Sequence, residues 1–340
     1  MKMVALASLA VMIGLLAICA AAAEPLPLTN VEEESNDEVM STLSPDFHQG
    51  SCPQLPGMVR AAVQDALRRD VQITAGLLRI FFHDCLPQGC DGSIFLDPER
   101  RFGPNGSLQP RAEQLVEDIR VRVHAACGPT VSCADILALA TRDAVNLAGG
   151  PFYGLSLGRQ DSLRPASSDQ IGILPGPTTP VDTLLRIFGG RGLGDPADLV
   201  ALSGGHTVGK ASCGFIRAND DFSRGLARQC SATPDRKQNL DVVTPVAFDN
   251  RYYVNLRNRQ GVLASDQGLA DHPRTRNIVN AFAANQGAFF DQFARSMVKM
   301  SNIRGAAGEI RRNTCFRPNG PRIVSSVADD QLDILLADSA

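Results

Sequence analysis

An arginine, a histidine and several oxygen-bearing side chains lie close together in residues 77–97 (LLRIFFHDCLPQGCDGSIFLD). Arg79 and His83 are four residues apart, and on a helix this spacing puts them on one face. Ile73 and Ile80 belong to an apolar stripe on another side of the same helix. One side of the predicted helix can therefore pack into a core, while the other presents a proton acceptor beside a fixed positive charge.

The sequence that follows His83 is typical of a loop that binds calcium. Three residues in it would turn the backbone, namely Pro87, Gly89 and Gly92. Three others offer side-chain oxygens, namely Asp84, Asp91 and Ser93. Calcium binds carboxylates, hydroxyls and free carbonyls that converge on one point. The alternative is a surface loop closed by a small disulfide, but the combination of residue types favours a functional site.

His206 is the second histidine that could bind a metal, and it lies in DLVALSGGHT, residues 198–207. A short apolar helix is expected to end at Gly204 and Gly205, where small residues would let a flat ligand approach the backbone. Taken alone, a histidine after a helix is more often structural than a metal ligand. The rest of the chain has to decide between the two interpretations.

The residues around both histidines are expected to be helical. Helical spacing of apolar residues predicts helices over 57–69, 70–84, 109–126 and 288–301. Another helix should begin after Ser132, which is placed to cap it, and end before Gly149. The last helix carries a stripe that is expected to be core rather than metal-binding, formed by Phe290, Phe293, Met297 and Met300. These patterns predict an all-α fold with little or no β structure.

The composition is that of a globular protein with a large core. Of 340 residues, 44% are hydrophobic and 20% are charged, and the formal net charge is −3. Acidic tails flank a mildly basic body, so the charge pattern argues against a nucleic-acid-binding protein.

Both ends of the chain are predicted to lie outside the folded body. Residues 1–23 are expected to be a signal peptide, because Lys2 precedes a short apolar run that ends in alanines. Residues 24–41 are acidic and unperiodic and are expected to be a disordered extension. No other stretch is long and apolar enough to span a bilayer, so the protein is expected to be secreted and free of the membrane after cleavage. The tail 317–340 is either a sorting propeptide, which would direct the protein to the vacuole, or a disordered end.

Eight cysteines remain once Cys19 leaves with the signal peptide. An even number in an oxidising compartment indicates disulfides, and the short spacing predicts a Cys85–Cys90 pair. Eight cysteines allow 105 pairings, so spacing leaves the others open. A zinc site is the alternative interpretation, but the chain has no paired C-x2-C motifs.

Three segments together resemble one family. They are the R-x-x-F-H-D-C-x4-C-D-G-S pattern that begins at Arg79, the stretch VSCADILALATRDAV with GGPFYGLSLGRQDS after it, and DLVALSGGHT. In these segments the chain is similar to the secretory plant (class III) haem peroxidases, the group that contains horseradish peroxidase. The resemblance runs from Leu43 to Cys315. It implies two helical domains that sandwich a haem within residues 42–316, with a distal part at about 42–185 and a proximal part at about 186–300.

The resemblance implies a role for each residue of the site. Arg79, His83 and Asn105 would be catalytic, with the Asn105 side chain accepting the N–H of His83. His206 would be the axial ligand of the haem iron, and Asp266 would accept its other N–H. The Asn105-Gly-Ser sequence is also a glycosylation motif, and an asparagine committed to a buried site would be a poor glycan acceptor.

The resemblance also implies two calcium sites and the remaining disulfides. The first set of ligands would be Asp84, Pro87, Gly89, Asp91 and Ser93. The second would be Thr207, Asp241, Thr244, Ala247 and Asp249. The further disulfides would be Cys52–Cys127, Cys133–Cys315 and Cys213–Cys230, and Asp135 and Arg159 would form a buried ion pair.

The function implied is that of a monomeric secreted peroxidase with one non-covalent haem b and two calcium ions. It would reduce hydrogen peroxide and oxidise small aromatic donors, and Pro175 and Phe215 would contact those donors. Two alternatives are a catalytically silent haem- and calcium-binding module and a disulfide-framed binding protein without haem. The short Cys213–Cys230 loop departs from the family pattern at the edge of the donor site. His48, His124 and His272 lie in polar sequence and are expected to be surface residues.

Overall fold

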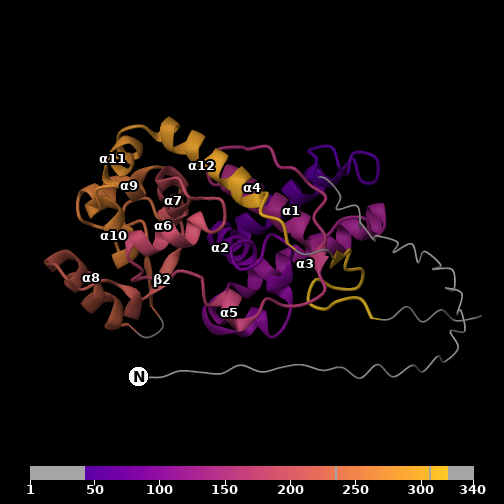
Figure 1. Ribbon diagram of the computed structural model, residues 1–340, viewed down its shortest axis with the longest axis horizontal. Helices are drawn as coiled ribbons and strands as arrows, with labels where there is room; N and C mark the ends of the chain where they lie inside the picture. The colour runs from indigo at the N-terminus through magenta and orange to yellow at the C-terminus, as the bar shows by residue number, and fades with distance from the viewer. Residues whose placement is uncertain (1–42, 234–235, 306–307, 321–340) are drawn as a thin grey trace, which may run out of the picture. The chain divides into compact units, whose positions relative to one another are not determined.

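Helices form most of the computed structural model, which describes residues 43–233, 236–305 and 308–320 (Figure 1). The predicted signal peptide, the acidic extension and the tail after residue 320 lie outside these residues. None of the helices in the described ranges is long and apolar enough to cross a membrane.

The predicted all-α class is confirmed, because the strands in the described residues are only two or three residues long. They form two small antiparallel pairs. β1 (Asp161–Ser162) pairs with β4 (Gly308–Glu309), so that Asp161 lies opposite Glu309. β2 (Lys210–Ser212) pairs with β3 (Lys237–Asn239), with Lys210 opposite Asn239.

Four long helices form the first half of the described chain. They are α1 (Leu55–Arg69), α2 (Ile73–Cys85), α3 (Pro110–Cys127) and α4 (Cys133–Leu147). α4 is buried from Cys133 to Val145 and contacts each of the other three. Since α2 carries Arg79 and His83, this packing holds the predicted catalytic helix against the most buried element of the fold.

The helix boundaries follow from local hydrogen bonds. Asp70 is extended (φ −151°, ψ 102°), and its carboxylate accepts a hydrogen bond from the amide of Gln72 at 2.9 Å. For this reason the helix expected from residue 70 begins only at Ile73. The predicted cap at Ser132 is confirmed, because its hydroxyl accepts the amide of Asp135 at 3.0 Å.

The second half of the described chain contains seven shorter helices and one long one, α12. They are α5 (Ser168–Ile171), α6 (Val181–Gly189), α7 (Pro196–Ser203), α8 (Asp221–Ser231), α9 (Arg251–Arg257), α10 (Ala264–Asp271), α11 (Arg276–Ala284) and α12 (Gln286–Ser301). α7 packs on α12, and α9 packs on both α10 and α11. α12 buries Phe293, Met297 and Met300 from its predicted stripe, which confirms that these side chains belong to the core.

An aromatic cluster lies behind the second histidine segment. Phe289 contacts Tyr253 and Phe282, at ring distances of 4.9 and 5.9 Å. A methyl group on Gly204 would lie 2.2 Å from the Tyr253 hydroxyl and 2.6 Å from the Phe289 ring. The aromatic core thus fills the space beside Gly204, whereas a methyl group on Gly205 would meet only Leu78, at 4.0 Å, so the expectation that a flat ligand approaches the backbone at this glycine pair stays a prediction.

The expectation that His48 lies on the surface is also wrong. Its side chain is 4% exposed, and its Nε2 lies 2.8 Å from a carboxylate oxygen of Asp135. The other Asp135 oxygen pairs with Arg159 at 2.9 Å, which confirms the predicted buried ion pair. His48 is thus part of a buried charge cluster that joins the start of the described chain to α4. His124 and His272 are only half-buried.

All four predicted disulfides are present, namely Cys52–Cys127, Cys85–Cys90, Cys133–Cys315 and Cys213–Cys230. Cys133–Cys315 joins residues 182 positions apart and ties the last described segment to the start of α4. Cys85–Cys90 closes the loop directly after His83 and Asp84. Cross-links of this kind restrict the unfolded chain and favour the folded state.

Candidate active site

His83 is buried near the end of α2 and bonds to a loop 22 residues away in the sequence. Its Nδ1 lies 2.7 Å from Oδ1 of Asn105, which sits in the short helix η3 (Gly103–Ser107). The Asn105 amide in turn donates to the backbone carbonyl of Glu99 at 3.0 Å, so its own orientation is fixed. Because the amide oxygen can only accept, the proton belongs on Nδ1, and Nε2 is the basic nitrogen.

The charge state of His83 follows from its surroundings. Burial, and after it the positive charge of Arg79, lower its pKa, and the hydrogen bond to Asn105 opposes them, so that the resulting pKa is about 4. The imidazole is therefore neutral near neutral pH and is ready to accept a proton.

Arg79 lies one turn before His83 on the same face of α2. Its Nε is 3.4 Å from Nε2 of His83, on the nitrogen that Asn105 leaves free. The rest of the guanidinium donates to the backbone carbonyls of Pro104 and Ser107 at 2.9 and 3.0 Å and to the Ser107 hydroxyl. The η3 loop therefore positions both the histidine, through Asn105, and the arginine.

Glu99 connects this histidine to the first predicted calcium loop, a connection that sequence reasoning missed. Its side chain is fully buried; it accepts the hydroxyl of Ser93 at 3.4 Å and also the amide of Ala166. Burial raises its pKa to about 7. In the sequence Glu99 only precedes a Pro-Asn-Gly turn. No pattern in the sequence indicates that Glu99 forms hydrogen bonds with both Ser93 and Asn105.

His206 lies in η4 (Gly204–Thr207), directly after α7. Its Nδ1 is 2.8 Å from Oδ1 of Asp266, in the first turn of α10. Surrounding atoms desolvate the ring and lower its pKa, but the charge and hydrogen bond of Asp266 outweigh this, and the net pKa is raised. Its side chain is 41% exposed, and in the described residues Nε2 has no hydrogen-bond partner.

The two histidine segments lie next to each other. Gly205 is within 4.0 Å of Leu78 on α2, as measured from the position that a methyl group on the glycine would take. The positive charge of Arg79 also acts on His206 and lowers its pKa. The structure thus brings together Arg79, His83, Asn105, His206 and Asp266, the residues to which the resemblance assigns roles in the site.

Three of the five residues predicted for the first calcium site gather in one place. Asp84 and Asp91 are buried, and Asp84 accepts the amides of Gly92 and Ile94 at 3.1 and 3.4 Å. Burial raises the pKa of Asp84 well above its usual range, and the charge of Asp91 raises it further. Ser93 donates its own amide to Asp91 at 3.1 Å.

The other two residues are placed differently. The carbonyl of Pro87 accepts a hydrogen bond from the guanidinium of Arg191, which sequence reasoning did not foresee. Gly89 has a positive φ of 123°, and a methyl group on it would lie 2.3 Å from the backbone carbonyl oxygen of Arg304. This part of the loop is therefore held by distant segments as well as by Asp91, which accepts the side-chain amide of Gln88 at 3.0 Å.

All five residues predicted for the second calcium site converge. The Thr207 hydroxyl lies 3.3 Å from Asp241, 3.4 Å from the Ala247 carbonyl and 3.4 Å from Asp249. The Thr244 hydroxyl lies 3.4 Å from the same oxygen of Asp241 and 3.1 Å from the same oxygen of Asp249. Two hydroxyl protons cannot satisfy five such approaches, so these oxygens crowd around one point.

The predicted donor contacts lie on two separate segments. Phe215, in η5 (Cys213–Phe215), is 52% exposed. Pro175 is half-buried in the loop after α5. The short Cys213–Cys230 loop contains α8, whose first turn is capped by Asp220.

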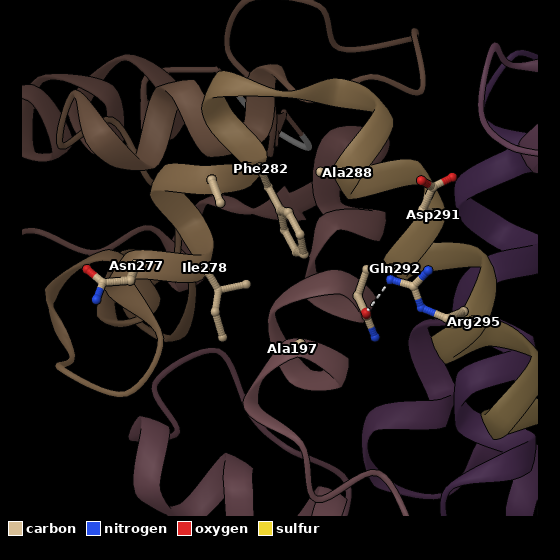
Figure 2. Close-up of a pocket in the computed structure, with 9 residues that line it drawn as sticks. Ala197, Asn277, Ile278, Phe282, Ala288, Asp291, Gln292 and Arg295 are labelled. Atoms are coloured by element: carbon tan, nitrogen blue, oxygen red, sulfur yellow. Dashed lines mark hydrogen bonds between the residues drawn. The ribbon is translucent and has the colours of Figure 1, made fainter.

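A groove of about 450 Å³ lies elsewhere, between α7, α11 and α12 (Figure 2). Ile278 and Phe282 form part of its lining, and Arg295 donates to Gln292 at its edge. Neither histidine lines it, so it is not part of the site described above.

Comparisons with known proteins identify relatives over most of the chain. Residues 59–285 match the family model for peroxidases. The chain is 46% identical to cationic peroxidase SPC4 of Sorghum bicolor, over 86% of this chain and 89% of that protein. It is 39% identical to peroxidase 12 of Arabidopsis thaliana, over 89% and 90% of the two chains. It is 40% identical to peroxidase 66 of Zea mays, over 82% and 90%.

The geometry of Asn105 leads to a prediction about its glycosylation motif. The side chain is 1% exposed, and its oxygen and nitrogen both have protein partners. We expect Asn105 to carry no glycan in folded protein produced in a eukaryotic secretory host, and peptide mass spectrometry of the active fraction checks this. A glycopeptide at Asn105 in active protein would contradict the contact between Asn105 and His83.

Proposed function

Because the chain belongs to the plant peroxidase family and is therefore an enzyme that uses hydrogen peroxide to oxidise a second substrate, we propose that it holds one non-covalent haem b between His83 and His206. The observation that carries the proposal is that both histidines make the same kind of hydrogen bond. Each histidine binds a protein oxygen through Nδ1, Asn105 for one and Asp266 for the other. Each therefore has Nε2 directed away from that partner, as a base and an axial ligand require.

The free imidazole nitrogen of His206 is a suitable ligand for a haem iron. The free nitrogen of a neutral imidazole is a common metal ligand, and a carboxylate on the other nitrogen fixes its tautomer and raises its basicity. Nε2 of His206 has no protein partner in the described residues, although the side chain is only partly exposed. We assign His206 as the axial ligand and Asp266 as the residue that orients it.

Haem, when bound, supplies an iron that coordinates peroxide and accepts two oxidising equivalents from it. The protein supplies the proton transfer. Nε2 of His83 takes the proton from one peroxide oxygen and gives it to the other, which leaves as water, so His83 acts first as base and then as acid. Arg79 stabilises the negative charge that develops as the oxygen–oxygen bond breaks.

The donors complete the stoichiometry. Two donor molecules each lose one electron and one proton, and the second peroxide oxygen also leaves as water. We propose small aromatic compounds, chiefly phenols, as the donors, with Pro175 and the exposed Phe215 as their contacts. A catalytically silent module would have no need of the contacts that fix Arg79, His83 and Asn105, and the comparisons do not favour it.

We propose a calcium ion at each of the two predicted loops. At the second loop, the crowding of Thr207, Asp241, Thr244, Ala247 and Asp249 fits a cation that takes hard oxygen ligands. At the first, Asp84 and Asp91 are buried like charges, and a cation between them would offset their repulsion. Ser93 and the Pro87 and Gly89 carbonyls would complete this set, with Pro87 also bonded to Arg191.

The remaining proposals concern the organisation of the chain. We propose a distal part up to about residue 185 and a proximal part from about 186 to 300, which together hold the haem. We further propose a monomer that is secreted after loss of residues 1–23, with the tail 317–340 as a signal that would direct it to the vacuole.

Replacing His83 tests the proton transfer. We expect His83→Ala to retain haem but to react with peroxide about 10²–10⁴ times more slowly in stopped-flow measurements, because it lacks the positioned base. His124→Ala is the matched control, since His124 lies on α3 and bonds to the Val131 carbonyl instead. Equal rates for the two variants would show that another group moves the proton.

Removing calcium tests the two oxygen clusters. Asp84 directly follows His83 and Thr207 directly follows His206, so a calcium ion on either neighbour would fix where the imidazole points. We expect prolonged chelation to change the haem absorption spectrum and lower activity before helical circular dichroism is lost, because four disulfides restrain the fold. Calcium should restore both.

Metal analysis provides the control for this experiment. Asp241→Asn should reduce the calcium content from two ions per chain to one, whereas Asp221→Asn, at an exposed position on α8, should leave it unchanged. If chelation removes the calcium and leaves both spectrum and rate unaltered, the two loops do not act on the histidines.

A further inference from the structure

Tyr252 shares a hydrogen-bond acceptor with His206. Its hydroxyl donates to Oδ1 of Asp266 at 2.9 Å, and the same oxygen accepts Nδ1 of His206 at 2.8 Å. The other carboxylate oxygen of Asp266 is buried and has no hydrogen-bond partner in the described residues. A single oxygen atom of Asp266 therefore accepts two hydrogen bonds, one from Tyr252 and one from His206.

The tyrosine is held in this position by its packing. Its side chain is 1% exposed, and its ring meets the ring of Tyr253 edge-on at 5.0 Å and that of His206 at 6.2 Å. Tyr253 is packed in turn against Phe282 and Phe289. A phenol enclosed in this way has little rotational freedom, so its hydroxyl stays on Asp266.

The hydroxyl is a donor in this contact. Burial raises the pKa of Tyr252 well above its usual range, and the charge of Asp266 raises it further. The phenol therefore remains protonated, and the carboxylate can only accept from it. The neighbouring Tyr253 makes no such contact, because its hydroxyl donates to the Val200 carbonyl at 2.9 Å.

We propose that Tyr252 is a positioning residue that limits the electron-donating strength of His206 by withdrawing charge from Asp266. A carboxylate bonded to the imidazole N–H makes the other nitrogen a stronger donor to a metal. A second hydrogen bond to the same oxygen stabilises the carboxylate and weakens its pull on the imidazole proton. The inference rests on the proposed role of His206 as the haem ligand.

The test is to remove the hydroxyl while keeping the ring. We expect Tyr252→Phe to lower the ferric/ferrous midpoint potential and to raise the iron–histidine stretching frequency in the Raman spectrum of the ferrous protein. Because the lost hydrogen bond is made to a charged group and only part of its effect reaches the iron through His206, the ferric-to-ferrous ratio should change on the order of tenfold, or about 59 mV. Tyr253→Phe is the matched control and should leave both unchanged.

The route through Asp266 is tested in a double variant. In an Asp266→Asn background, Tyr252→Phe should no longer shift the potential, because the charged acceptor is gone. A shift that persists there, or no shift in the single variant, would overturn the proposal. A rise in potential in Tyr252→Phe would overturn it too, because the hydroxyl would then only hold Asp266 in place.

Failure of this inference can be told apart from failure of the proposed function. If His206 is not the axial ligand, the unaltered protein lacks the iron–histidine Raman band altogether. If the band is present but does not respond to Tyr252→Phe, His206 binds the iron and Tyr252 does not modulate it.

Discussion

A buried oxygen fixes the orientation of each of the two histidines on which the site depends. Asn105 accepts from His83 and Asp266 accepts from His206, at 2.7 and 2.8 Å. Asn105 is neutral and Asp266 is a carboxylate, so the two acceptors affect the pKa of their histidines differently. The neutral amide of Asn105 does not offset burial and the charge of Arg79, so the pKa of His83 stays low, which suits a group that must take up and release a proton. A carboxylate makes His206 more basic, which suits a metal ligand.

The fold supports these two contacts through segments that are distant in the sequence. α4 packs against α2, the helix that carries His83, and the Cys85–Cys90 disulfide begins two residues after His83. Glu99 connects Asn105 to Ser93, and Arg191 reaches the Pro87 carbonyl from the second half of the chain. On the other side, Tyr252 and the aromatic cluster fix Asp266. Most of these supporting residues are buried, and their own hydrogen bonds fix where they direct the two histidines.

Local patterns in the sequence predicted the parts of the structure that depend on local physics. Helical spacing predicted the long helices to within a few residues, and the hydroxyl of Ser132 predicted a cap. Family motifs predicted which distant residues would meet, including the buried pair of Asp135 and Arg159. What could not be predicted lies in contacts between distant side chains that no motif describes. His48 looks like a surface residue because its partner, Asp135, is 87 positions away. The tight packing of Gly204 could not be predicted either, because the aromatic rings beside it come from α9 and α12.

The central claim is that His206 is the haem ligand, and replacement of its side chain tests this claim most directly. In His206→Gly, the haem absorption spectrum should change and peroxidase activity should fall, because the imidazole is missing while Asp266 remains in place. Free imidazole, diffusing into the space that the side chain has left, should restore the original spectrum in proportion to its occupancy. If His206→Gly binds haem with an unaltered spectrum and reacts with peroxide at the original rate, His206 does not bind the iron.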